Sequence, residues 1–93
     1  MKVYPLLYAQ VSKDGIVLII VAEVFSSAEY AMEYAFSLAE GWMERPPHDI
    51  IERPVRYEAP RNTGLITMYG ESGQKVSELA VWAETVRPDG WHA

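Results

Sequence analysis

The two histidines and the acids beside one of them are the first residues to consider for chemistry. His48 is followed by Asp49 and Glu52, and these side-chain types serve as metal ligands and as general acids and bases. Two prolines precede His48, and the second histidine, His92, stands near the other end of the chain. We therefore interpret His48 as a loop residue in solvent and predict no metal site.

A glycine-containing segment at residues 70–75, Gly-Glu-Ser-Gly-Gln-Lys, has some likeness to a phosphate-binding loop. That motif requires four residues between its glycines and a Gly-Lys-Ser/Thr ending, whereas here two residues separate the glycines and Gln74 precedes Lys75. We predict a hairpin turn instead. The chain has no cysteine and no Gly-x-Ser-x-Gly elbow, so neither a thiolate nor a marked serine nucleophile is present. The sequence predicts a non-enzymatic protein without catalytic residues or cofactors.

The acidic residues are more informative. With 13 acids and 8 bases in 93 residues the net charge is −5, which argues against direct binding of nucleic acid. Four glutamates lie within about 60° of one another on a predicted helix and form a line about 22 Å long. We call them the acidic ridge: Glu29, Glu33, Glu40 and Glu44. No Lys or Arg occurs between Lys13 and Arg45.

Two tyrosines, Tyr30 and Tyr34, flank the acidic ridge on the predicted helix. A row of like charges on one face is either a solvated surface or a complement to a basic partner. We predict that the ridge docks on a basic groove of a protein partner, of the kind that holds nucleic acid, with the tyrosines as anchors. No direct contact with nucleic acid or membrane is expected.

The helix that carries the ridge is predicted over residues 27–44. Ser26 is its expected N-cap and Glu29 its third residue, which makes a capping box, and Phe25 and Tyr30 are spaced for a hydrophobic staple. The helix must end before Pro46, because a residue preceding proline is disfavoured in helical conformation. Its other face is an apolar stripe of alanine, methionine, phenylalanine, leucine and tryptophan that we expect to pack on a sheet.

Residues 3–25 read as a β-hairpin. If Asp14 and Gly15 form a two-residue turn, residues whose numbers sum to 29 face each other. Both faces are then largely apolar, so something must cover the second one. The alternative to a partner-binding module is therefore a homodimer that uses one face of this hairpin, at Tyr4, Tyr8, Val21 and Phe25.

The remainder is a proline-rich loop at 45–64 and strands within 65–87. The loop mixes arginines with acids and contains one short edge strand at 55–58. Residues 76–86 fit both strand and helix spacing, and their Val, Trp and Thr content favours a strand. A turn at 87–90 and a tail at 91–93 close the chain. We predict a single α+β domain over 1–93, a mostly antiparallel sheet with one helix in the order ββαβββ.

This arrangement resembles phage-encoded anti-CRISPR proteins, which are small, acidic chains. The resemblance lies in the charge, the hairpin and the helix entered through Val24-Phe25-Ser26-Ser27-Ala28-Glu29. It implies a non-enzymatic inhibitor of the Cas machinery that acts in the host cytoplasm, in some members through an acidic surface that competes with DNA. The absence of a recognisable secretory signal and of a long apolar run agrees with a cytoplasmic location.

Residues 4–45 are also similar to the beginning of HicB-type antitoxins. The similarity rests on Tyr4-Pro5, on Asp14-Gly15 and on Ser27-Ala28-Glu29 opening an alanine-rich helix, although the Leu-Pro-Gly stretch of that family is absent before the helix. It implies an antitoxin as the alternative function.

Overall fold

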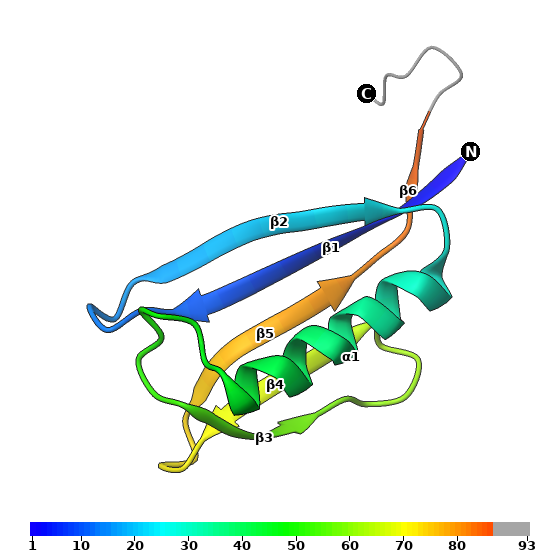
Figure 1. Ribbon diagram of the computed structural model, residues 1–93. Coiled ribbons are helices and arrows are strands. Elements are labelled where there is room, and N and C mark those ends of the chain that lie inside the picture. Colours follow the sequence, from blue (N-terminus) through cyan, green and yellow to red (C-terminus); the bar gives the residue numbers. More distant parts are fainter. Residues whose placement is uncertain (87–93) are drawn as a thin grey trace.

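The described strands form one antiparallel sheet, and one described helix lies across one of its faces (Figure 1). The structure, a computed structural model, describes residues 1–86. The strand order is β2-β1-β5-β4-β3, and the short β6 pairs with the beginning of β1. The elements are β1 (Lys2–Val11), β2 (Val17–Phe25), α1 (Ala28–Glu44), β3 (Pro54–Glu58), β4 (Leu65–Gly70), β5 (Lys75–Val81) and β6 (Glu84–Thr85). The predicted α+β fold is confirmed, and β6 extends the predicted order by one strand. The predicted turn at 87–90, the tail at 91–93 and His92 lie outside the described residues.

The helix α1 begins one residue later than predicted. Ser27 is its N-cap, in extended conformation, and the Ser27 hydroxyl accepts a hydrogen bond from the backbone N–H of Tyr30 at 3.4 Å. Glu29 is thus the second helical residue, so the predicted capping box with Ser26 is wrong. The reason lies in the preceding strand: Phe25 still pairs with β1, and Ser26 is used in leaving the sheet.

The β1–β2 hairpin has a three-residue turn rather than the predicted two-residue turn. The backbone N–H of Ser12 donates to the carbonyl of Ile16 at 2.9 Å, and Gly15 takes a left-handed φ of 79°. Where residues 7–11 of β1 face residues 17–21 of β2, the two residue numbers of each facing pair therefore sum to 28, one less than predicted. A β-bulge at Ala22 restores the predicted sum of 29 near the end of the hairpin. The one-residue shift moves Val21 to the opposite face of the sheet.

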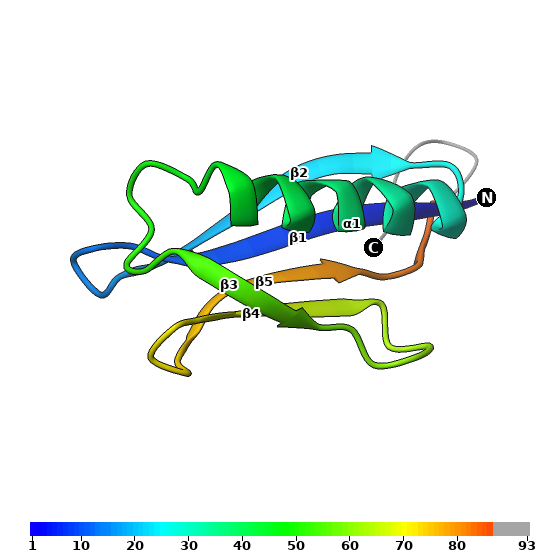
Figure 2. The ribbon, with the colours of Figure 1, turned by 60° about the horizontal axis from the view of Figure 1, so that its bottom comes forward.

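The core lies between α1 and the face of the sheet that α1 covers. Leu6, Ile66 and Leu79, from β1, β4 and β5, are fully buried there. Ala31, Ala35 and Ala39 form the buried stripe of the helix, together with larger side chains that are partly exposed. Because alanine adds little bulk, the helix backbone can approach the sheet closely. Figure 2 shows α1 over one face, whereas no other described helix covers the opposite face.

The strand prediction for the ambiguous segment 76–86 is confirmed in β5 and β6, with a break at residues 82–83 that the prediction of one strand missed. The longer strand, β5, lies in the middle of the sheet between β1 and β4. The predicted short strand in the loop is also confirmed as β3, which forms one edge of the sheet. The other edge is β2. The central position of β5 brings residues from both halves of the sequence into one core.

Candidate functional site

His48, Asp49 and Glu52, the described residues first considered for chemistry, do not form a metal-binding cluster. His48 is exposed in the loop between α1 and β3. Among residues 1–86, no group of three or more histidine and acidic side chains is close enough to hold a metal ion. Asp49 is also exposed. Its backbone carbonyl accepts a hydrogen bond from the backbone N–H of Lys13 at 2.8 Å.

Glu52, the second of the two acids near His48, instead clamps the turn between β4 and β5. Its carboxylate accepts hydrogen bonds from the Ser72 backbone N–H at 2.8 Å, the Ser72 hydroxyl at 2.6 Å and the Gln74 side-chain amide at 2.8 Å. The bonds from the side chains of Ser72 and Gln74, and then the backbone bond, lower the pKa of Glu52 below its ordinary value of 4.5. Gly70 makes room for this side chain, because a Cβ at Gly70 would collide with the Glu52 carboxyl group.

The segment 70–75 is therefore a hairpin turn, as predicted. The group that its Ser72 and Gln74 donors bind is the Glu52 carboxylate of this chain. The backbone N–H of Gly73 donates to the carbonyl of Gly70 at 3.0 Å, which closes the turn. The sequence did not predict the Glu52 clamp, because the hydrogen-bond donors to Glu52 lie 20 and 22 residues further along the chain.

The acidic ridge is on the solvent side of α1, and all four of its glutamates are exposed. Among the described residues the ion pairs are Arg56–Glu58 at 3.2 Å and Lys75–Glu78 at 3.4 Å, and both lie on the strands. No basic residue occupies the last turn of the helix. The ridge is thus a continuous line of carboxylates without a counter-charge from the described part of the chain.

An arginine from the following loop stabilises the C-terminal end of α1. The Arg53 guanidinium donates to the Met43 carbonyl at 3.0 Å from Nε and at 2.7 Å from Nη2, and it approaches the Glu44 carbonyl at 3.5 Å. A cation at this position offsets the negative end of the helix dipole. Arg53 bonds to backbone carbonyls, which leaves the carboxylate of Glu44 free to face solvent.

The two tyrosines predicted as anchors differ in their surroundings. Tyr30 has 66% of its surface exposed, and Tyr34 has 41%. The ring of Tyr34 packs against Phe25 with the ring centres 5.4 Å apart. Tyr34 is therefore held in place beside the acidic ridge, whereas Tyr30 projects into solvent.

The hairpin face predicted for a homodimer is not a single surface. Tyr4, Tyr8 and Phe25 lie on the face that α1 covers, where Tyr8 packs edge-on against Trp42 at 5.1 Å. Val21 is opposite Leu7 on the other face, because of the register shift described above. The structure corrects this grouping: three of the four residues belong to the region around the helix, and Val21 belongs to the open face.

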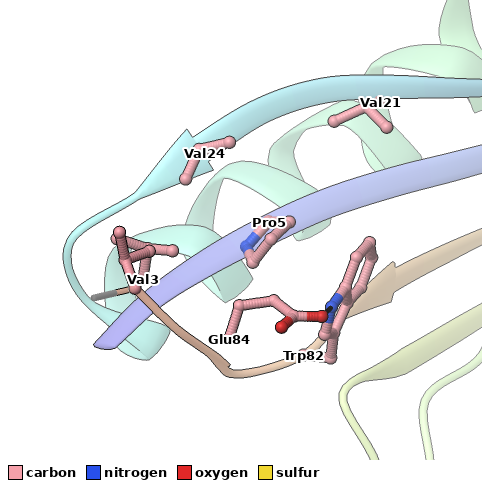
Figure 3. A pocket seen from close by; sticks show the side chains of 7 residues that line it. Val3, Pro5, Val21, Val24, Trp82 and Glu84 are labelled. Atoms are coloured by element: carbon pink, nitrogen blue, oxygen red, sulfur yellow. Dashed lines mark hydrogen bonds between the residues drawn. The ribbon is translucent and has the colours of Figure 1, made fainter. Parts of the chain in front are cut away.

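A shallow apolar pocket of about 420 Å³ lies on that open face (Figure 3). Val3 and Pro5 of β1, Val21 and Val24 of β2 and Trp82 line it. The indole N–H of Trp82 donates to the Glu84 carboxylate at 2.8 Å, which fixes the ring beside Pro5. Sequence reasoning missed this pocket, although the prediction of a second uncovered apolar face indicated the region.

The comparisons with known proteins add no relative: no family model, no curated protein and no solved structure matches this chain. Within residues 1–86, no helix has the length and apolar character needed to cross a membrane.

Proposed function

We propose that this protein is a non-enzymatic protein-binding module that inhibits its partner by docking the acidic ridge on a basic groove. The observation that carries the proposal is the line of four exposed carboxylates on α1 without a counter-charge among the described residues. A groove that normally holds nucleic-acid phosphates has the complementary charge and a matching elongated shape.

The spacing of the ridge has an energetic cost that a helix selected only for stability would avoid. Glu29 and Glu33, like Glu40 and Glu44, stand four residues apart, and each such like-charge pair costs about 0.2–0.5 kcal/mol. The buried alanine stripe and the Arg53 contacts at the helix end stabilise α1 independently of these side chains. The glutamates can therefore be changed without loss of the fold, which makes the proposal testable.

The nature of the partner follows from the resemblance to anti-CRISPR proteins together with the charge of the ridge. We take a CRISPR–Cas effector in the host cytoplasm as the partner, and the ridge competes with DNA for its basic groove. Tyr34, held by Phe25, contributes a fixed aromatic contact beside the charges.

The test uses purified CRISPR effector complexes, one multisubunit and one single-protein, with labelled target DNA in a gel-shift assay. The wild-type protein is expected to displace DNA from at least one of them. The double variant E33K/E40K should lose this inhibition, whereas the control D49K/E71K, which changes two exposed acids outside the ridge and the ion pairs, should retain it. Both variants change the net charge from −5 to −1, since each replaces two acids by two bases.

Circular dichroism and thermal unfolding establish that both variants are folded before the comparison. Equal inhibition by the two variants contradicts docking through the ridge, because net charge alone would then account for binding. Absence of inhibition by the wild-type protein in every complex contradicts the proposed partner class.

A further inference from the structure

The edge strand β2 presents an unusual surface. Every residue from Val17 to Val24 is exposed, and six of these eight have aliphatic side chains larger than that of alanine. Ile19, on the open face, has 65% of its surface exposed, and Ile20, on the face toward α1, has 43%. Scattered exposed aliphatic residues are normal, but a continuous run along both faces of one strand is typical of a surface that meets a partner.

The backbone of β2 is also available along its outer side. Because Ser12 N–H bonds to the Ile16 carbonyl, alternation along the antiparallel ladder directs the backbone groups of Leu18 and Ile20 toward β1. The N–H and C=O groups of Val17, Ile19 and Val21 then point to the free edge, where no described strand pairs with them. A partner strand at this edge would satisfy these groups with backbone hydrogen bonds.

The two edges of the sheet differ in how they are protected against such pairing. The β3 edge begins at Pro54, has a bulge between Pro54 and Arg56, and carries the Arg56–Glu58 ion pair. Prolines, bulges and charges are the devices by which proteins keep edge strands from pairing. Residues 17–21 of β2 contain neither proline nor charge, and the bulge at Ala22 lies beyond them.

We propose that β2 is a dimer interface, at which two copies of this chain pair their β2 strands antiparallel across a two-fold axis at Ile19. In this register Val17 faces the partner's Val21 and Ile19 faces the partner's Ile19, so the outward backbone groups form about six hydrogen bonds. On the other face of the strand, Leu18 meets the partner's Ile20. Every facing pair in the centre of the interface is aliphatic.

The size of the surface is consistent with a dimer. The aliphatic side chains larger than alanine in the segment 16–24 are between 42% and 65% exposed. Together they expose on the order of 600 Å² per copy, which is the low end of the area that specific interfaces bury on each partner. A stable interface of standard size buries about 800 Å² per partner. The protected β3 edge stops further addition, so the pairing closes at two copies instead of extending into a fibre. The acidic ridge lies on the solvent side of α1 and supplies no contact to this interface.

The test combines mass measurement with charge substitutions at Ile19 in the full chain. Light scattering after size exclusion is expected to give twice the 10.5 kDa monomer mass for the wild-type protein at micromolar concentration. I19K should raise the dimer dissociation constant about 100-fold, because both copies lose the burial of Ile19 and two like charges face each other on the axis. The matched control V55K places the same charge on the β3 edge, where Val55 is 49% exposed, and should leave the dimer unchanged.

A mixture of I19K and I19E identifies the register. Only a two-fold axis at residue 19 sets lysine directly opposite glutamate, so the mixture should form a heterodimer although neither variant dimerises alone. Failure of this rescue overturns the proposed register, and a monomeric wild-type protein overturns the proposal.

Hydrogen exchange of the wild-type protein distinguishes β2 pairing from other coverings. The amides of Val17, Ile19 and Val21 should be protected in the dimer and exchange rapidly in I19K, whereas those of Leu18 and Ile20 stay protected in both. A dimer in which protection does not alternate between outward and inward amides indicates that two sheets stack face to face. Protection of the outward amides in a monomer indicates that another part of the same chain, such as residues 87–93, covers the edge. Either result contradicts strand pairing.

Discussion

Leu79 provides the most direct measure of how this small fold is stabilised. It has no exposed surface and lies in the central strand, opposite Tyr8 of β1 and Ile66 of β4. Leu79→Ala removes about three carbon groups, worth about 2.4 kcal/mol of lost burial, and leaves a cavity that adds about 1 kcal/mol. The expected loss is thus about 3–4 kcal/mol, against a total stability of roughly 5–14 kcal/mol for 93 residues.

The matched control is Leu65→Ala, which makes the same chemical change in the neighbouring strand. Leu65 is 37% exposed and lies on the open face, so its truncation creates no enclosed cavity and should cost about 1.5 kcal/mol. Urea unfolding at one protein concentration measures both, since dimerisation makes apparent stability depend on concentration. The midpoint for Leu79→Ala should fall by about 2 M with an unchanged slope. Equal shifts for the two variants would refute the placement of the core between α1 and β5.

Three further predictions concern single positions. Gly64→Ala should lower the free energy of unfolding by about 2 kcal/mol or more, because Gly64 has a φ of 67° and a Cβ there would strike a backbone carbonyl of β5. Gly41→Ala in the helix should instead raise it by about 0.5–1 kcal/mol, because alanine favours the helix over glycine. Thermal unfolding of the two variants shows whether their shifts have opposite signs. Ser27→Ala should cost about 1 kcal/mol and Ser26→Ala almost nothing, and the reverse order in urea unfolding contradicts the observed N-cap. Glu52→Gln should be less stable than the wild type at neutral pH. Because the folded-state pKa of Glu52 is lowered, its contribution to stability is complete above pH 4.5 and is lost as the pH falls through the folded-state pKa. The difference in unfolding free energy between wild type and Glu52→Gln, measured by urea unfolding, should therefore shrink in acid. A difference that stays constant from pH 7 to 3 would contradict the clamp.

Local residue chemistry was sufficient to predict the helix and its end, but not the hairpin register. Asp14-Gly15 suits a two-residue turn, and a glycine with positive φ equally suits the last position of a three-residue turn. The sequence contains no signal that separates the two. The difference is one residue, yet it reverses the faces of residues 17–21, since side chains alternate along a strand. The error in grouping Val21 with Tyr8 comes entirely from this step.

Contacts between distant segments account for what the sequence did not reveal. The Glu52 clamp joins a loop acid to a turn 20 residues later, and the sheet order depends on β5 pairing with β1 across most of the chain. The prediction that both hairpin faces are apolar correctly indicated a surface in need of cover. It could not show that β2 is the outermost strand, because that position is set by where β5 inserts.

The two proposed surfaces respond to salt in opposite directions. Pairing across a two-fold axis perpendicular to the sheet places both α1 helices on the same face, so a dimer carries two acidic ridges side by side and a net charge of −10, twice −5. Salt screens this repulsion, so the aliphatic β2 interface should be as strong or stronger at high ionic strength. Docking of the ridge on a basic groove should weaken under the same conditions. A dimer that dissociates in 0.5 M salt would therefore contradict the β2 interface. Binding to the DNA-free effector that is undiminished in 0.5 M salt would contradict docking through the ridge, and direct binding is the readout because salt also weakens the effector's own contacts with DNA. Since each surface fails on a result that leaves the other intact, one salt titration read by light scattering and by binding to the DNA-free effector tests them separately.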